Sequence, residues 1–83
     1  MKHKSNVDGF ESLEKLATEI GDLKYDSLSE FLMLLSEKIK SDSKSDLERG
    51  RTKLSDSLIS ASDCLWESSI HIGESWRISK KFM

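Results

Sequence analysis

Proline is absent from this chain, and cysteine, aromatic residues and long apolar runs are scarce. The only cysteine is Cys64, so no intrachain disulfide can hold the fold together. The longest apolar run, residues 31–35, is far shorter than the roughly 18 to 20 residues that a membrane-spanning helix needs. These absences exclude a disulfide scaffold and a membrane span. A proline-free chain of 83 residues, 34% of them charged, favours helices.

The charge balance does not point to a partner. The chain has 13 lysine and arginine residues, 15 aspartate and glutamate residues, and a formal net charge of −2. A value so close to neutral does not by itself indicate a nucleic acid or an acidic ligand. The lone cysteine and the absence of an apolar segment behind the charged N-terminus favour a reducing compartment, so we expect a cytoplasmic protein.

Three amphipathic segments follow one another along the chain. In each, an N-cap residue precedes a glutamate by three positions: Asp8 and Glu11, Ser27 and Glu30, Ser45 and Glu48. Apolar residues then recur at steps of three and four, as one stripe of a helix requires. The pattern predicts helices over about 9–20, 27–40 and 45–79, and the third begins within a flexible polar run at 41–46.

The third segment sets the expected fold. At about 1.5 Å per residue it would be roughly 50 Å long, about twice the length of either other helix. We therefore expect an all-α domain over residues 1–83, in which two short antiparallel helices pack on one long C-terminal helix. This three-helix bundle would be completed by dimerisation, with residues 1–7 and 81–83 frayed. Gly73, inside the long helix, predicts either a bend or the close approach of another backbone.

The segments carry more apolar surface than one chain of this size can cover. The third has a main stripe that includes Leu54, Leu58 and Leu65, and a second seam to one side of it. Further apolar residues in the second segment also fall off its main stripe. This surplus predicts a homodimer. We expect the interface to include the following six residues: Met33, Leu34, Ile59, Trp66, Ile70 and Trp76.

The chemically reactive side chains do not form a recognisable catalytic or metal site. His71 has Glu67 and Glu74 on adjoining turns, but the other two segments offer no inward-facing ligands to complete a metal centre. Cys64 and His71 would be separated by roughly 10 Å along one helix, too far for direct proton transfer. We therefore expect no catalytic, cofactor-binding or metal-binding residues and no enzymatic activity.

The surplus of apolar surface favours protein interaction as the class of function. We expect a small, non-catalytic helical protein that associates with itself and presents a helix surface to another protein. The alternative is a nucleic-acid-associated regulator that uses the basic region 38–53, although acidic residues offset about half of that charge and no nucleic-acid motif is present. Its contacts would be six basic residues: Lys38, Lys40, Lys44, Arg49, Arg51 and Lys53.

Overall fold

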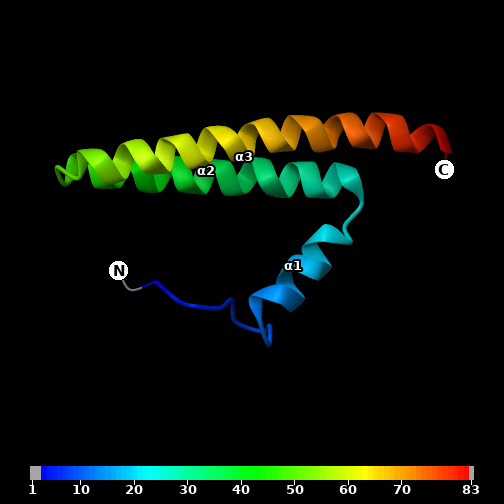
Figure 1. Cartoon of the computed structure of the whole chain (residues 1–83), viewed down its shortest axis with the longest axis horizontal. Helices are drawn as coiled ribbons and strands as arrows, with labels where there is room; N and C mark the ends of the chain where they lie inside the picture. Colours follow the sequence, from blue (N-terminus) through cyan, green and yellow to red (C-terminus); the bar gives the residue numbers. More distant parts are fainter. Residues whose placement is uncertain (1–2, 83) are drawn as a thin grey trace.

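The computed structural model describes residues 3–82 and is built from three helices. These are α1 (Leu13–Gly21), α2 (Tyr25–Glu48) and α3 (Thr52–Ser79), and a single 3₁₀ turn, η1 (Lys80–Phe82), follows α3. The described residues contain no strand, which confirms the all-α class with three helices. As Figure 1 shows, α2 and α3 run side by side as a long antiparallel hairpin. The Cα positions extend over 50 × 29 × 13 Å, so the molecule is one helix layer thick.

The first helix begins later than the sequence predicted. Gly9 has a φ of 90°, a left-handed conformation that a right-handed helix cannot contain, so the expected start near Gly9 with Asp8 as its cap is wrong. Ser12 is the actual N-cap, and its hydroxyl accepts a hydrogen bond of 3.1 Å from the backbone N–H of Lys15. Only nine residues remain for α1, about 14 Å of helix.

α1 stands apart from the hairpin. It leaves the start of α2 at an angle, and the segment before it runs back along the hairpin without joining it (Figure 1). Close packing between helices is confined to α2 and α3 within the described residues. The arrangement therefore differs from the expected bundle, in which both shorter helices would cover the long one.

The predicted break at 41–46 is also wrong, because this polar run is helical. α2 continues through it to Glu48, and α3 begins at Thr52 instead of Ser45. Polar residues can occupy this stretch because one of them, Ser43, faces α3 and is fully buried. The two helices of the hairpin are consequently 24 and 28 residues long, nearly equal in length.

The turn between α2 and α3 follows from Gly50. This glycine has a φ of 78° and directly follows the last residues of the helix. The N–H of Arg51 donates to the carbonyl of Asp46 at 2.8 Å, and the N–H of Gly50 donates to the carbonyl of Leu47 at 3.0 Å. These two bonds form a Schellman motif, which satisfies carbonyls that the end of a helix leaves free.

Serines form the contact between the two long helices, which we call the serine seam. They recur every seven residues, so each set lies on one helix face: Ser29, Ser36 and Ser43 in α2, and Ser55, Ser62 and Ser69 in α3. Five of the six are at most 5% exposed, and they are the only buried side chains among residues 3–82. The seam, not an apolar core, therefore lies at the centre of the hairpin.

Hydrogen bonds across the seam bring the two backbones close together. The hydroxyl of Ser62 donates to the carbonyl of Ser36 at 2.7 Å, and that of Ser43 donates to the carbonyl of Ser55 at 2.9 Å. A third bond of 2.7 Å joins Ser29 to the carbonyl of residue 69. A side chain as short as serine is needed at these positions, since its hydroxyl reaches directly from one helix to the main chain of the other.

Gly73 belongs to the same contact. α3 continues through it to Ser79. A β-carbon placed on Gly73 would lie 3.5 Å from the hydroxyl oxygen of Ser29, which is ordinary van der Waals distance. The neighbouring helix does come close at this position, one of the two expectations for Gly73, but the space would also accept an alanine.

We expect Gly73→Ala to raise the free energy of unfolding by about 0.5–1 kcal/mol, because alanine is the better helix former and its methyl group fits beside Ser29. Urea unfolding followed by circular dichroism measures the change. A loss of stability would contradict this prediction and would mean that the helices are too close to accept even one methyl group.

We expect Ser62→Leu to lower the free energy of unfolding by about 1–3 kcal/mol, because the larger side chain must push α2 and α3 apart. Ser62→Ala keeps the spacing and loses one hydrogen bond, at a cost of about 1 kcal/mol. Ser60→Leu is the matched control, since Ser60 is exposed on the same helix. An equal effect of the two leucine substitutions in urea unfolding would refute the role of the seam.

Candidate interaction surface

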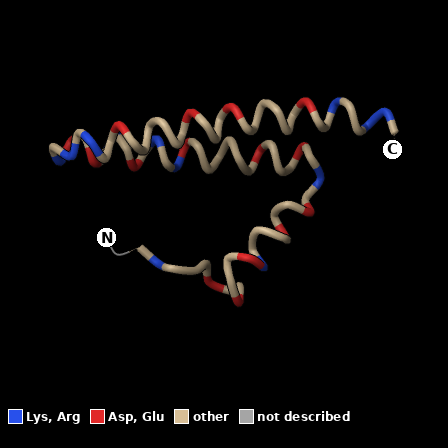
Figure 2. The backbone as a smooth tube through the Cα atoms, viewed as in Figure 1, with Lys and Arg blue, Asp and Glu red and all other residues tan. Residues whose placement is uncertain are grey.

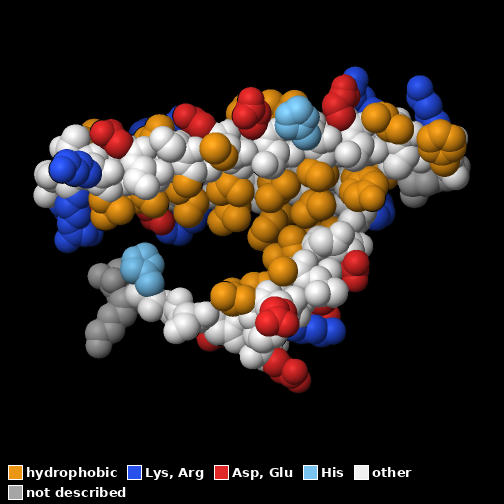
Figure 3. Space-filling model, in the orientation of Figure 1, with side chains coloured by type: hydrophobic (Ala, Val, Ile, Leu, Met, Phe, Trp, Pro, Cys, Tyr) orange, Lys and Arg blue, Asp and Glu red, His pale blue; other side chains and the backbone are white. Residues whose placement is uncertain are grey.

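One side of the hairpin carries a broad band of aliphatic side chains, which we call the leucine face. It consists of Leu28, Leu32, Leu35 and Ile39 in α2, and Leu54, Leu58, Leu65 and Ile72 in α3. Apart from Leu54, which is 45% exposed, these residues are half-buried, and none of them is fully covered. Figure 3 shows hydrophobic side chains gathered in a band along this side, over both helices.

The position of the leucine face follows from the seam. At about 100° per residue, Leu35 and Leu32 lie on one flank of Ser36, and Leu58 and Leu65 lie on the corresponding flank of Ser62. Because the two helices are antiparallel and meet at their serines, these two flanks point to the same side of the hairpin. The serines thus join two apolar stripes, each with steps of three and four residues, into one continuous surface.

The opposite side carries a smaller apolar patch, which we call the tryptophan face. It consists of Met33 from α2 with Ile59, Trp66 and Ile70 from α3, all on the other flank of the seam. Trp66 is 48% exposed and Ile70 is 53% exposed, whereas Met33 and Ile59 are half-buried. The structure therefore brings together four of the six residues that the sequence assigned to an interface.

The other two predicted interface residues lie elsewhere. Leu34 is 54% exposed on the side of α2 that points away from α3. Trp76 is half-buried at the open end of the hairpin, where α2 begins and α3 ends, and the Lys24 ammonium lies 5.9 Å from its ring centroid. A small hollow of about 190 Å³ surrounds this pair and is lined by Leu23, Lys24, Tyr25, Trp76 and Ser79.

The basic residues of region 38–53 are mixed with acidic residues around the turn of the hairpin. Figure 2 shows lysines and arginines alternating there with aspartates and glutamates. Lys38 is paired with Asp42 at 2.6 Å, and Arg51 is paired with Asp46 at 3.2 Å. The six predicted nucleic-acid contacts are therefore gathered at one end of the molecule, but their charge is partly neutralised.

The candidate reactive side chains point outward. Cys64 and His71 are both exposed on the side of α3 that faces away from α2. Among the residues that the structure describes, no three histidine, cysteine, aspartate or glutamate side chains are grouped so that they could hold a metal ion. None of the helices within residues 3–82 has the length and hydropathy that crossing a membrane requires.

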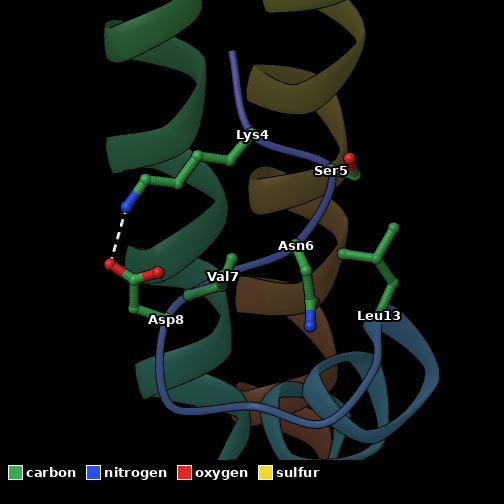
Figure 4. A pocket seen from close by; sticks show the side chains of 6 residues that line it. All are labelled: Lys4, Ser5, Asn6, Val7, Asp8 and Leu13. Carbon is green, nitrogen blue, oxygen red and sulfur yellow. Dashed lines mark hydrogen bonds and ion pairs between the residues drawn. The ribbon is translucent and has the colours of Figure 1, made fainter. Parts of the chain in front are cut away.

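A second hollow, of about 480 Å³, lies in the N-terminal segment. Its lining comes from six residues of this segment and the start of α1: Lys4, Ser5, Asn6, Val7, Asp8 and Leu13. Figure 4 shows Lys4 reaching toward Asp8, with which it forms an ion pair of 2.6 Å. Both partners are exposed, so the pair leaves no charged group held ready for a ligand.

Sequence reasoning missed the serine seam, although a signal for it was present. Both sets of serines repeat at a spacing of seven residues, which is visible when the chain is written in heptads. The apolar stripes of the second and third segments were interpreted as facing the chain's own core. In the structure these stripes form the leucine face, and the serines beside them make the contact.

No family model, curated protein or solved structure matches this chain. The interpretation of its surfaces therefore rests on the geometry described above.

Proposed function

We propose that this protein is a non-catalytic, self-associating protein-interaction module that assembles through its leucine face. The observation that carries the proposal is the absence of any buried hydrophobic side chain among residues 3–82. Covering an aliphatic side chain contributes about 1.5–3 kcal/mol, and the hairpin alone leaves most of this contribution unrealised. A partner that covers the leucine face would supply the missing core.

The exposed area supports a second copy as that partner. The chain exposes 6721 Å², whereas a compact monomer of 9.5 kDa exposes about 5,000 Å², so the excess is roughly 1,700 Å². Part of this excess belongs to α1 and the segment before it, which stand apart from the hairpin. Two chains that each buried half of the excess would still form an interface of about 1,700 Å², the size of a typical specific protein interface. The radius of gyration of 15.2 Å also exceeds the roughly 12 Å expected for a compact domain of this length.

The tryptophan face would remain on the outside of such a dimer. It is the surface that the sequence predicted to meet another chain, and Trp66 and Ile70 leave about half of their area exposed there. The single cysteine supports placement in a reducing compartment, which we take to be the cytoplasm.

Replacing Leu65 with lysine tests the leucine face. We expect Leu65→Lys to weaken self-association by at least about a hundredfold, since a charge would have to be buried in the interface. Ile70→Lys is the matched control on the opposite face and is expected to leave association unchanged. Sedimentation equilibrium measures both, and circular dichroism verifies that the helices are retained.

Two results would contradict this proposal. If the unmodified protein is a monomer at high concentration, the self-association is wrong. If Ile70→Lys abolishes association and Leu65→Lys does not, the tryptophan face is the interface, as the sequence analysis predicted.

Binding of nucleic acid is the second candidate function, favoured by the gathering of six basic residues at the turn. Such binding should weaken steeply as the salt concentration rises. We expect no retention on a heparin column at about 0.15 M salt, because the cluster is mixed with aspartates that pair with two of its members. Firm retention there, lost in Lys40→Glu and Lys44→Glu variants, would favour this alternative.

A further inference from the structure

We infer that two copies pair through their leucine faces in an antiparallel orientation and form a four-helix bundle. In this arrangement the turn of each hairpin lies at the open end of the other. The inference rests on the proposed self-association and adds which end of one copy meets which end of its partner.

The length of the leucine face favours another long hairpin as its occupant. Along α3 the leucine face extends from residue 54 to residue 72, about 27 Å, whereas α1 is only about 14 Å long. α1 folded back on the hairpin would therefore leave about half of the length of the face uncovered. A second leucine face has the same length and the same steps of three and four residues, which are the requirements of bundle packing.

The leucine face has a different character at its two ends. Along α2, the spacing of its aliphatic residues continues beyond Ile39 to Asp42 and Asp46, near the turn. The side chains of these aspartates are 36% and 14% exposed, so they belong to the margin of the face. At the open end, the corresponding position one turn before Leu28 is Lys24, a cation.

This polarity distinguishes the two possible orientations. A parallel pair would gather the four aspartates of both copies at one end and the two Lys24 side chains at the other. An antiparallel pair separates the aspartates and places each Lys24 about one turn from an Asp46 of the other copy. Asp42 and Asp46 already have cationic partners within the chain, so their attraction to Lys24 of the other copy adds little affinity. The aliphatic residues supply the affinity, and the charges select the orientation.

The position of α1 agrees with this orientation. α1 and the segment before it leave the open end of the hairpin; hydrophobic side chains continue onto this arm where it joins the hairpin, and open space separates the rest of the arm from the band (Figure 3). In an antiparallel pair the two α1 helices lie at opposite ends of the bundle, each beside the turn of the other copy. In a parallel pair both would leave from the same end.

Disulfide trapping between two differently substituted chains tests the orientation. In a Cys64→Ser background, Leu54→Cys and Ile72→Cys chains are mixed and oxidised. The antiparallel bundle places residue 54 of one copy against residue 72 of the other, so we expect a cross-linked heterodimer.

A mixture of Leu28→Cys and Ile72→Cys chains should cross-link only in the parallel bundle. Ile59→Cys mixed with Ile70→Cys is the control on the tryptophan face.

Sedimentation of the reduced mixtures separates the two levels of the proposal, and circular dichroism verifies their helicity. A cross-link in the 54 and 72 mixture, and in neither of the others, supports the antiparallel bundle. A dimer that cross-links in the 28 and 72 mixture overturns the orientation but leaves self-association standing. A dimer that cross-links through residues 59 and 70 overturns the leucine face as the interface. Monomeric chains without cross-links overturn self-association and the orientation together.

Discussion

The structure depends on the close approach of α2 and α3, which the serine seam permits. A hydroxyl on one helix bonds directly to a main-chain carbonyl on the other, as Ser62 does with Ser36 at 2.7 Å. Larger side chains at these positions would separate the helices, because interhelical distance is set by the residues at the contact. The register follows from the same contact, since each step of seven residues along α2 meets a step of seven in the opposite direction along α3. The seam therefore determines which other residues share a face.

A polar seam also changes where stability comes from. Each hydrogen bond between protein groups adds only about 1 kcal/mol net, while ordering a residue costs about 1–2 kcal/mol in backbone entropy. The contribution that normally offsets this cost is apolar burial, and the hairpin places its aliphatic residues beside the contact instead of within it. Formation of the hairpin and covering of the leucine face should consequently be coupled, as in dimers whose monomers are only marginally stable. The same geometry accounts for the exposed area and for the proposed partner.

Much of the secondary structure could be predicted from the sequence, because apolar residues at steps of three and four indicate helices regardless of what the helices contact. The helix boundaries were harder to predict from the sequence. The polar run at 41–46 resembles a loop, and only knowledge that Ser43 faces α3 shows why it is helical. Gly50, whose positive φ ends α2, was the better signal for the turn. The sequence indicated that Met33, Trp66 and Ile70 were apolar residues in excess of what the chain could cover. That they lie on one face of the hairpin follows from the seam, which the sequence reasoning had missed. The leucine stripes were identified correctly as helix faces and assigned to a core that the single chain does not form.

The two apolar faces differ in a way that bears on their roles. The leucine face is long, continuous over both helices and composed of aliphatic side chains, which suits the extended packing of a bundle. The tryptophan face is short, comes mainly from α3, and has at its centre a half-exposed aromatic side chain of the kind enriched in protein interfaces. In a dimer built through the leucine faces, the two tryptophan faces would point in opposite directions. Self-association would thus cover the larger apolar surface and duplicate the smaller one. A single-layer hairpin with a polar seam can do this because the buried contact between its two helices is made by the serines and lies between the two faces.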